Sequence, residues 1–321
     1  MTEPHPLRWP KTSSMTAAAS AAGSLGALIE LTKPRLSLLV VLTTGLGYGM
    51  ACGASWSVVE LAATLVGTAL AAGSANALNQ WSEARSDARM ERTRYRPLPA
   101  GRLDARTALL FATAAGIAGV TLLACAVTPL AALLALAAIA IYVGLYTPLK
   151  KVTTLNTLFG AVAGALPPLI GWTAGAEQGL EGAWVLFAIL FVWQIPHFMA
   201  VAWIYREDYL QGGFRMLPVV DPSGRMTAQV VLLFLLALVP VSLSAAAVGL
   251  AGPVYLAGTL VVGLLFLACG WRFHRERSDA TARRLFVASL VYLPAVMTLM
   301  VLDRLPRGAV EVAERAVTSG G

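Results

Sequence analysis

Long apolar segments alternate with short polar connections along the whole chain. Runs of about 20 apolar residues, the length that crosses a bilayer as a helix, recur nine times. The predicted spans are 36–53, 57–80, 107–126, 130–149, 155–174, 183–203, 227–249, 254–270 and 285–302. Turn and helix-breaking residues, such as Thr128-Pro129 and Gly252-Pro253, separate them. The pattern predicts an all-α polytopic membrane protein with nine transmembrane helices.

The basic residues follow this alternation. They lie before span 1 and in the connections after spans 2, 4, 6 and 8, which all fall on one side of a nine-span arrangement. Of the 24 Lys and Arg residues, only Arg304, Arg307 and Arg315 in the C-terminal tail lie elsewhere. By the positive-inside rule, the N-terminus and the long connections are expected in the cytosol and the C-terminus outside.

Composition supports the membrane prediction. The chain is 57% hydrophobic and only 13% charged, and its mean hydropathy is +0.70. The net charge of +7 does not indicate nucleic-acid binding, because the basic residues lie in short connections between apolar spans. The three cysteines lie far apart in apolar stretches, so we interpret them as small buried hydrophobic residues rather than as disulfide or metal ligands.

The sequence predicts three parts. Residues 1–27 are polar, lack an apolar signal-peptide core and predict a disordered cytosolic tail, with a mitochondrial presequence as the minor alternative. Residues 28–302 form the nine-helix domain, and residues 303–321 form a short C-terminal tail.

The first candidate site follows span 2. Asn79, Glu83 and Asp87 are spaced i, i+4, i+8, so a continuing helix places them on one stripe, about 6 Å of rise apart. Hard oxygen ligands of this kind suit Mg²⁺, which completes its shell with waters and substrate phosphates. Arginines such as Arg92 and Arg96 follow and can hold phosphate oxygens. The alternative is a solvated loop in which the acids pair with arginines.

The second candidate site lies at the end of span 6. His197 lies within a span, and an ionisable group there is a functional candidate, although a lone histidine is more often a core residue. Asp208 follows eleven residues later, at the predicted cytosolic surface. This arrangement suits a substrate with a charged head and an apolar body. Tyr146 and Lys150, one turn apart at the end of span 4, place a further cation on the same side.

A transporter or channel is the non-enzymatic alternative. It predicts polar residues distributed along the spans as a pathway, whereas here they gather at the inner ends of spans 2, 4 and 6.

These residues resemble a known family. Asn79-xxx-Glu83-xxx-Asp87, followed by Arg92-Thr93-xx-Arg96-Pro97, is similar to the metal–diphosphate motif of the UbiA-type intramembrane prenyltransferases. Further motifs resemble the protoheme IX farnesyltransferase branch in order and spacing: Leu31-Thr32-Lys33-Pro34-Arg35, Tyr146-Thr147-xx-Lys150-Lys151, Gly164-Ala165-xx-Pro168-Leu169-Ile170-Gly171-Trp172, Trp193-Gln194-x-Pro196-His197-Phe198 and Arg206-Glu207-Asp208-Tyr209. Two departures concern the metal ligands. Glu83 stands where the superfamily more often has Asp, and Ile204 stands where a second DxxxD motif ending at Asp208 would begin.

The resemblance implies nine helices around a central cavity and a Mg²⁺-dependent transfer of the farnesyl group of farnesyl diphosphate to a vinyl group of heme B, giving heme O and diphosphate. It implies metal ligation by Asn79, Glu83 and Asp87 with help from Asp208, and diphosphate binding by Arg92, Arg96, Lys150 and Arg206. It also implies a heme-binding region with His197, Trp193 and Gln194. His197 could ligate the iron or handle the proton of the water, and we favour a heme-positioning role for it.

The residues leave the prenyl acceptor open. Another prenyl acceptor, such as a quinone precursor or chlorophyllide, is the closest enzymatic alternative. A heme A synthase is the expected downstream partner. The expected location is the bacterial cytoplasmic membrane, or the mitochondrial inner membrane in a eukaryote.

Overall fold

The computed structural model describes residues 25–52, 56–175 and 179–304. Apart from one isolated bridge between Ala251 and Arg304, the described residues form helices, turns and short connections. The helices are α2 (Pro34–Ala51), α3 (Val58–Asp87), α4 (Ala105–Ala126), α5 (Pro129–Ala140), the π-helix η1 (Ile141–Tyr146), α6 (Thr147–Leu149), α7 (Asn156–Ala165), α8 (Pro167–Gly175), α9 (Glu181–Ile204), α10 (Arg206–Gly212), α11 (Leu217–Val220), α12 (Arg225–Ala247), α13 (Pro253–Glu276) and α14 (Asp279–Leu302). The predicted all-α class is confirmed.

Capping residues fix where several helices begin. Ser57, Asp104 and Thr128 each accept a hydrogen bond from a main-chain amide in the first turn of α3, α4 and α5. Ser278 begins α14 with a reciprocal capping box that includes Thr281. These short polar caps satisfy amides that the apolar helices themselves leave unpaired.

The number of membrane spans is confirmed only in part. Within the described residues, eight helical stretches are long and apolar enough to cross a membrane, and α2 is not among them. Two spans are also less regular than predicted. The span predicted at 155–174 breaks at Leu166 into α7 and α8, because Pro167 and Pro168 cannot donate main-chain hydrogen bonds. The span predicted at 130–149 contains the π-helix η1.

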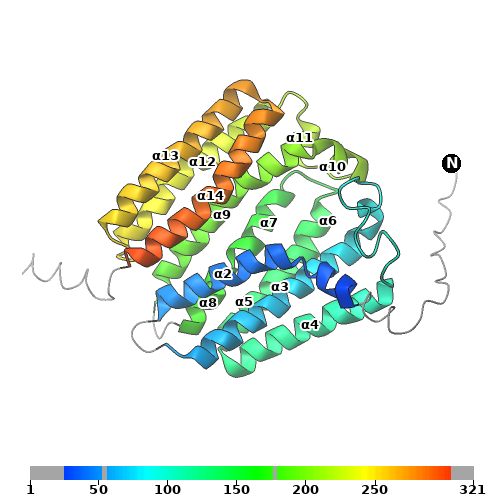
Figure 1. The fold of residues 1–321 in the computed structure, drawn as a ribbon, viewed down its shortest axis with the longest axis horizontal. Helices are drawn as coiled ribbons and strands as arrows, with labels where there is room; N and C mark the ends of the chain where they lie inside the picture. Colours follow the sequence, from blue (N-terminus) through cyan, green and yellow to red (C-terminus); the bar gives the residue numbers. More distant parts are fainter. Residues whose placement is uncertain (1–24, 53–55, 176–178, 305–321) are drawn as a thin grey trace, which may run out of the picture.

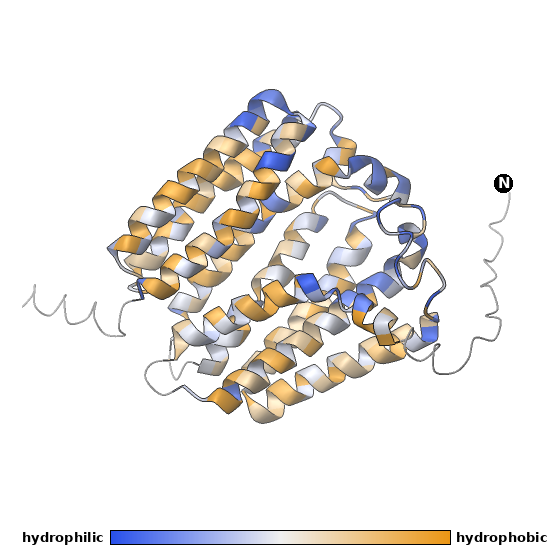
Figure 2. Cartoon of the chain, in the orientation of Figure 1, coloured by the Kyte–Doolittle hydropathy of each residue, from blue (hydrophilic) through white to orange (hydrophobic). Residues whose placement is uncertain are grey.

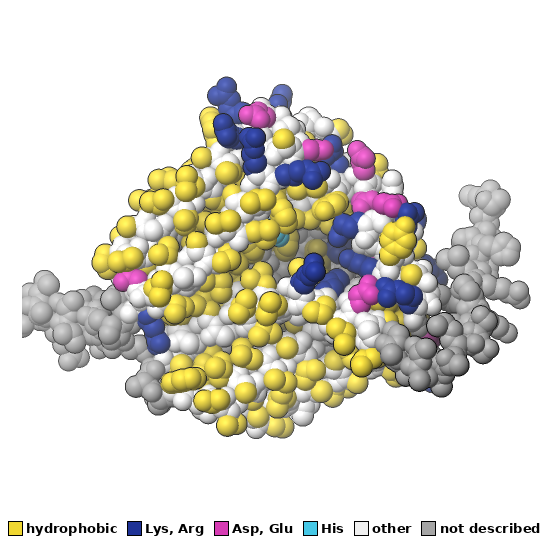
Figure 3. Space-filling view, in the orientation of Figure 1, with side chains coloured by type: hydrophobic (Ala, Val, Ile, Leu, Met, Phe, Trp, Pro, Cys, Tyr) yellow, Lys and Arg dark blue, Asp and Glu magenta, His cyan; other side chains and the backbone are white. Residues whose placement is uncertain are grey.

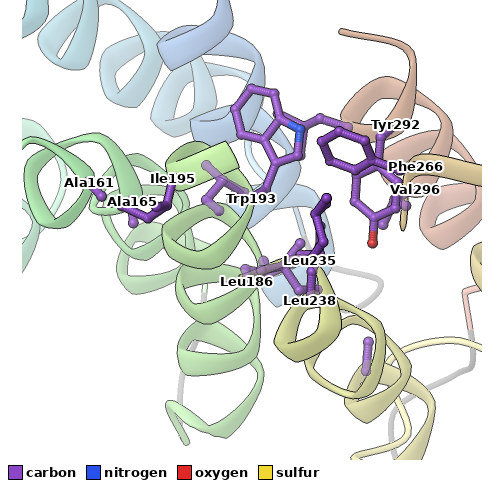
Figure 4. Packing of buried hydrophobic residues seen from close by; sticks show 14 of the residues in the cluster. Ala161, Ala165, Leu186, Trp193, Ile195, Leu235, Leu238, Phe266, Tyr292 and Val296 are labelled. Atoms are coloured by element: carbon purple, nitrogen blue, oxygen red, sulfur yellow. The ribbon is translucent and has the colours of Figure 1, made fainter. Parts of the chain in front are cut away.

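The helices form two groups. In one, α9, α12, α13 and α14 pack on each other, and in the other, α2, α3, α4, α5 and α8 do so, with α7 packing on α9 (Figure 1). The core of the first group is apolar, and Figure 4 shows Trp193, Leu235, Leu238 and Tyr292 converging between α9, α12 and α14. Outward-facing side chains such as Leu233 and Leu265 are 63% exposed, which suits a lipid environment.

Close approach of α2 and α8 depends on glycine. A Cβ added at Gly47 would overlap the carbonyl of Pro168, and one at Gly171 would overlap the carbonyl of Thr44. The two backbones therefore approach more closely than larger residues would permit, as in other small-residue helix contacts within membranes. This contact positions α2 and, with it, the residue that precedes it, Lys33.

Hydrophilic residues gather at one end of the bundle, around α10, the C-terminal end of α3 and the α13–α14 connection (Figure 2). Figure 3 shows a hollow in the middle of the visible face, with a histidine side chain inside it and basic side chains along one side. Residues 1–24 and 305–321, which make up most of the two predicted tails, lie outside the described residues. Residues 25–31 are already helical, and Ala27 and Leu31 in this segment are buried.

Candidate active site

The predicted ligand stripe lies on a single helix. α3 continues to Asp87, beyond the span predicted at 57–80, and therefore carries Asn79, Glu83 and Asp87 on consecutive turns. All three side chains are buried, with at most 4% of each residue exposed. Two acids in such a place require compensation, because an uncompensated buried charge is costly.

Each residue of the stripe has a basic partner. Lys33 donates to Asn79 Oδ1 at 3.0 Å. Lys150 Nζ lies 2.8 Å from Glu83 Oε1, and Arg96 Nη1 lies 2.7 Å from Asp87 Oδ2. These three basic residues come from the start of α2, the end of α6 and the loop after α3. We call the six residues, Lys33, Asn79, Glu83, Asp87, Arg96 and Lys150, the charged mouth.

The surroundings of the two lysines shift their pKa values in opposite directions. Burial alone would lower the pKa of Lys150, but the Glu83 carboxylate outweighs it and raises that pKa above its ordinary value. For Lys33, burial and the positive charges of Arg96 and Lys150 lower the pKa to about 7. Lys33 therefore faces a neutral amide and other cations, whereas Lys150 is held in its charged form.

The donor set fits a divalent metal ion. Asp87 Oδ1 is buried and has no hydrogen-bond partner, so it remains available to a ligand. Asn79 donates from Nδ2 to Thr147 Oγ1 at 3.0 Å, so its amide group is oriented and its oxygen accepts from Lys33. One amide oxygen and two carboxylates are the hard ligands that Mg²⁺ prefers. The described ranges hold no group of three His, Cys, Asp or Glu side chains arranged for a metal, so this set depends on the Asn79 amide as its third ligand.

Asp208, the fourth predicted metal ligand, has another partner. Its carboxylate accepts hydrogen bonds from the main-chain amides of Glu91 (3.2 Å) and Arg92 (3.4 Å), and so ties the loop after α3 to α10. Arg89 makes a second tie, donating to the Gly212 carbonyl at 2.9 Å. Metal ligation by Asp208 therefore stays a prediction.

The four residues predicted to bind diphosphate separate into two pairs. Arg96 and Lys150 are in the charged mouth, where each pairs with a predicted metal ligand. The guanidinium of Arg92 lies 4.9 Å from the ring centre of Tyr205, and Arg206 pairs with Asp279 at 2.7 Å. The structure therefore does not bring Arg92 and Arg206 to the stripe.

The π-helix accounts for the position of Lys150. A π-helix adds a residue to the turn and often occurs at functional positions. Immediately after η1, Thr147 donates to the Tyr142 carbonyl and accepts from Asn79. Lys150 Nζ lies 4.5 Å from the ring centre of Tyr146, and its main-chain carbonyl accepts from the Arg215 amide. The side chain is therefore fixed from several directions.

The second predicted site lies between α9 and α14. His197 is half-buried, and its ring stacks on Trp193 with a centroid distance of 5.1 Å. His197 Nδ1 lies 2.8 Å from Ser289 Oγ, and Trp193 Nε1 donates to the main-chain oxygen of Ser289 at 2.9 Å. Gln194 is buried and donates to the carbonyls of Leu190 on its own helix and of Ala161 on α7, so this side chain joins α9 to α7.

Sequence reasoning assigned no site role to several residues that the structure places here, although Lys33 stands in one of the motifs of the resemblance. Lys33 and Ser289 contact predicted residues but lie 46 and 92 positions from them in the chain. Asn76 and Gln80 anchor the segment before α2 by donating to the carbonyls of Thr32 and Leu31. The sequence did contain a signal for this contact, because Asn76 and Gln80 are side-chain amides one turn apart in an apolar span. Buried polar groups require partners, so a polar contact to another segment was to be expected there.

Comparisons with known proteins identify the class. The UbiA prenyltransferase family matches residues 40–293, and the chain belongs to this family of intramembrane prenyltransferases. The protoheme IX farnesyltransferase of Solibacter usitatus is 46% identical over 86% of this chain and 98% of its own length. That of Opitutus terrae is 46% identical over 86% of this chain and 94% of its own length.

Solved structures support the fold. A digeranylgeranylglyceryl phosphate synthase superposes with a TM-score of 0.74 at 16% identity, covering 87% of this chain and 98% of its own. A UbiA homolog from Archaeoglobus fulgidus, bound to GPP and Mg²⁺, superposes with a TM-score of 0.64 at 17% identity, covering 85% of this chain and 99% of its own.

Proposed function

We propose that the protein is a protoheme IX farnesyltransferase. It transfers the farnesyl group of farnesyl diphosphate to a vinyl group of heme B, with addition of water, and releases heme O and diphosphate. The observation that carries the proposal is the charged mouth, in which three potential metal ligands and three basic side chains meet at the polar end of a membrane bundle. Relatives of the same name at 46% identity support the choice of acceptor.

The charged mouth suits a metal–diphosphate group. Asn79, Glu83 and Asp87 would hold Mg²⁺, which when bound supplies positive charge to the diphosphate oxygens. Each ligand now contacts a basic side chain, so occupation of the ligands by a metal would release Lys33, Lys150 and Arg96. The released side chains can then bind the diphosphate and stabilise the negative charge that develops on it as it leaves.

The remaining predicted site residues would have to change partners to take part. Asp208 would have to release the Glu91 and Arg92 amides to reach a metal. Arg206 would have to leave Asp279, and Arg92 would have to leave the tyrosine rings, to reach a diphosphate. The geometry therefore favours the three cations of the charged mouth as the diphosphate-binding set.

The acceptor would lie deeper in the bundle. His197 lies on α9, seven residues before the helix ends at Ile204, among the aromatic rings of Trp193, Phe198 and Phe286. The flat apolar rings of Phe198 and Phe286 suit a porphyrin, and the imidazole suits its iron. The product would be the substrate of an oxidising enzyme such as a heme A synthase. We place the reaction in the bacterial cytoplasmic membrane, with the N-terminus in the cytosol and the C-terminus outside.

An activity assay of the purified protein tests this function. The protein is supplied with farnesyl diphosphate, heme B and Mg²⁺ in lipid–detergent micelles. We expect diphosphate release together with a heme product whose mass has increased by one farnesyl group and one hydroxyl group, because the other proton of the water leaves with the diphosphate. Reaction with a quinone precursor or chlorophyllide instead of heme would identify another acceptor. Release of no diphosphate with any acceptor would favour the transporter alternative.

A further inference from the structure

The hydroxyl of Ser289 contacts two groups at once. Ser289 is fully buried on α14, and its Oγ lies 2.5 Å from the main-chain oxygen of Phe286 and 2.8 Å from His197 Nδ1. A carbonyl oxygen only accepts hydrogen bonds, so the single hydroxyl proton is donated to Phe286. The oxygen of Ser289 therefore has only lone pairs to offer His197, and Nδ1 must carry a proton.

This arrangement selects one form of the imidazole. A neutral histidine carries one N–H, so a proton on Nδ1 leaves a lone pair on Nε2. Within the described residues Nε2 has no hydrogen-bond partner, and it is not among the buried unpartnered atoms, so it faces accessible space. A nitrogen with a free lone pair, oriented by a hydrogen bond to the other nitrogen, is the usual form of a histidine metal ligand.

The orientation of the ring is fixed as well. Trp193 stacks on His197 with an angle of 22° between the ring planes, and Phe286 lies 5.3 Å from the imidazole on a centroid basis. Trp193 is itself held by its hydrogen bond to the main-chain oxygen of Ser289. Ser289 thus fixes both rings, the indole through its backbone and the imidazole through its hydroxyl.

We propose that Ser289 is a positioning residue of the acceptor site, which holds His197 as the Nδ1–H tautomer so that Nε2 can ligate the iron of a porphyrin. The proposal rests on the proposed function, since it takes the iron porphyrin to be the acceptor. It assigns Trp193 to the support of the imidazole ring rather than to direct contact with the substrate, because only 4% of that residue is exposed.

The chain offers a matched pair of variants. Ser289→Ala removes the hydroxyl but keeps the main-chain oxygen that holds Trp193. Ser242→Ala removes an equally buried hydroxyl, which bonds to the Tyr292 hydroxyl at 2.7 Å and does not contact His197. A loss of stability that arises only because a buried hydrogen bond was removed should therefore appear in both variants.

Nitrogen NMR of protein labelled with ¹⁵N-histidine reads the tautomer directly. The chain has three histidines, and the resonances missing from His197→Ala identify those of His197. We expect wild type and Ser242→Ala to show a protonated Nδ1 and an unprotonated Nε2, and Ser289→Ala to show a mixture of tautomers. An unprotonated Nδ1 in wild type would overturn the proposal.

Titration with ferric protoheme reads the consequence for binding. We expect the Soret band of the wild-type complex to report a nitrogen ligand, and Ser289→Ala to bind roughly tenfold more weakly, as is typical when a supporting hydrogen bond to a metal ligand is lost. His197→Ala should lose the ligand signature, and Ser242→Ala should match wild type. Equal affinity and equal spectra for Ser289→Ala and wild type would contradict the positioning role.

Product formation, measured in parallel, separates the two proposals. If wild type makes heme O while Ser289→Ala binds protoheme with an unchanged spectrum, the positioning role fails and the proposed function stands. If wild type transfers the prenyl group to a different acceptor and His197→Ala leaves the protoheme spectrum unchanged, both the acceptor assignment and the role of Ser289 fail.

Discussion

The charged mouth and the surroundings of His197 solve the same physical problem in different ways. Both place polar groups in a bundle that is apolar on most sides. In the charged mouth, Glu83 and Asp87 are compensated by full charges at 2.8 and 2.7 Å. At His197, a single neutral hydrogen bond from the ring to Ser289 is sufficient, because the imidazole can remain uncharged.

The difference indicates what each region can accept. Paired charges can exchange partners, so the charged mouth can accept an ionic group provided that this group brings charges of both signs, as a metal–diphosphate does. A neutral imidazole held by one nitrogen offers its other nitrogen and flat apolar surfaces, which suits a porphyrin. The four predictions that follow test this contrast, beginning with the largest expected effect.

Asp87→Asn is expected to have the largest effect on heme O formation. The substitution puts a neutral amide in place of a carboxylate whose Oδ1 has no hydrogen-bond partner. The charged mouth therefore loses part of its attraction for a metal. We expect heme O formation to fall by about 100-fold, a typical loss for one electrostatic contact at a reacting centre. Glu91→Gln, an exposed acid in the adjacent loop that pairs only with Arg94 in the described structure, is the matched control and should retain activity. Wild-type rates for Asp87→Asn would exclude the metal role.

Lys150→Met is expected to destabilise the fold. It leaves the Glu83 carboxylate buried without its cation, which costs about 3–5 kcal/mol. The free energy of unfolding in mixed micelles measures this loss. Lys151→Met, at an exposed neighbouring position, should lie close to wild type. Adding Glu83→Gln to Lys150→Met should recover part of the loss, and a double variant no more stable than Lys150→Met would argue against charge compensation.

Gly171→Ala should distinguish the two regions. Its new Cβ would overlap the backbone of α2 at Thr44 and so displace the helix that follows Lys33, at a cost of about 1–3 kcal/mol. His197 and Ser289 lie on α9 and α14, so protoheme binding should be retained while farnesyl transfer falls. Gly49→Ala, where nothing lies within 4 Å of the added atom, is the control. Equal losses of both activities would show that the regions are not independent.

Asp221→Ala measures how much an acid outside both regions contributes to the free energy of unfolding. Burial alone would raise the pKa of Asp221, but hydrogen bonds from Thr227 and Ser223 outweigh it and hold the pKa below its ordinary value. This carboxylate therefore stabilises the fold at neutral pH, and the contribution disappears as the pH falls through the lowered pKa. We expect a loss of at most about 1 kcal/mol at neutral pH, because solvent screens a carboxylate at this partly exposed position. Unfolding measured at several pH values should show wild type approaching the variant in acid, and a constant difference would contradict the assignment.

The sequence predicted best what is local in the chain. The helical stripe of Asn79, Glu83 and Asp87 depends only on a spacing of four residues, and it is confirmed as a stripe on α3. The apolar periodicity likewise predicted the all-α class. The membership of the family was predictable because its motifs are short and contiguous.

Tertiary partners could not be predicted in the same way. The contacts of Asn79 with Lys33 and of His197 with Ser289 depend on packing between distant helices. The positions of Arg206 and Asp208 depend on competing partners, Asp279 and the loop amides, which no local pattern reveals. The break at Leu166 is different, because the pair Pro167-Pro168 was visible in the sequence. The prediction of one continuous span gave more weight to the apolar pattern than to these two prolines.

Calorimetric titration of inorganic diphosphate into the wild-type protein, with and without Mg²⁺, tests the central claim most directly. The charged mouth should bind diphosphate tightly only when the metal is present, because a metal held by Asn79, Glu83 and Asp87 would release the basic side chains. Equal diphosphate affinity with and without Mg²⁺ would contradict this account.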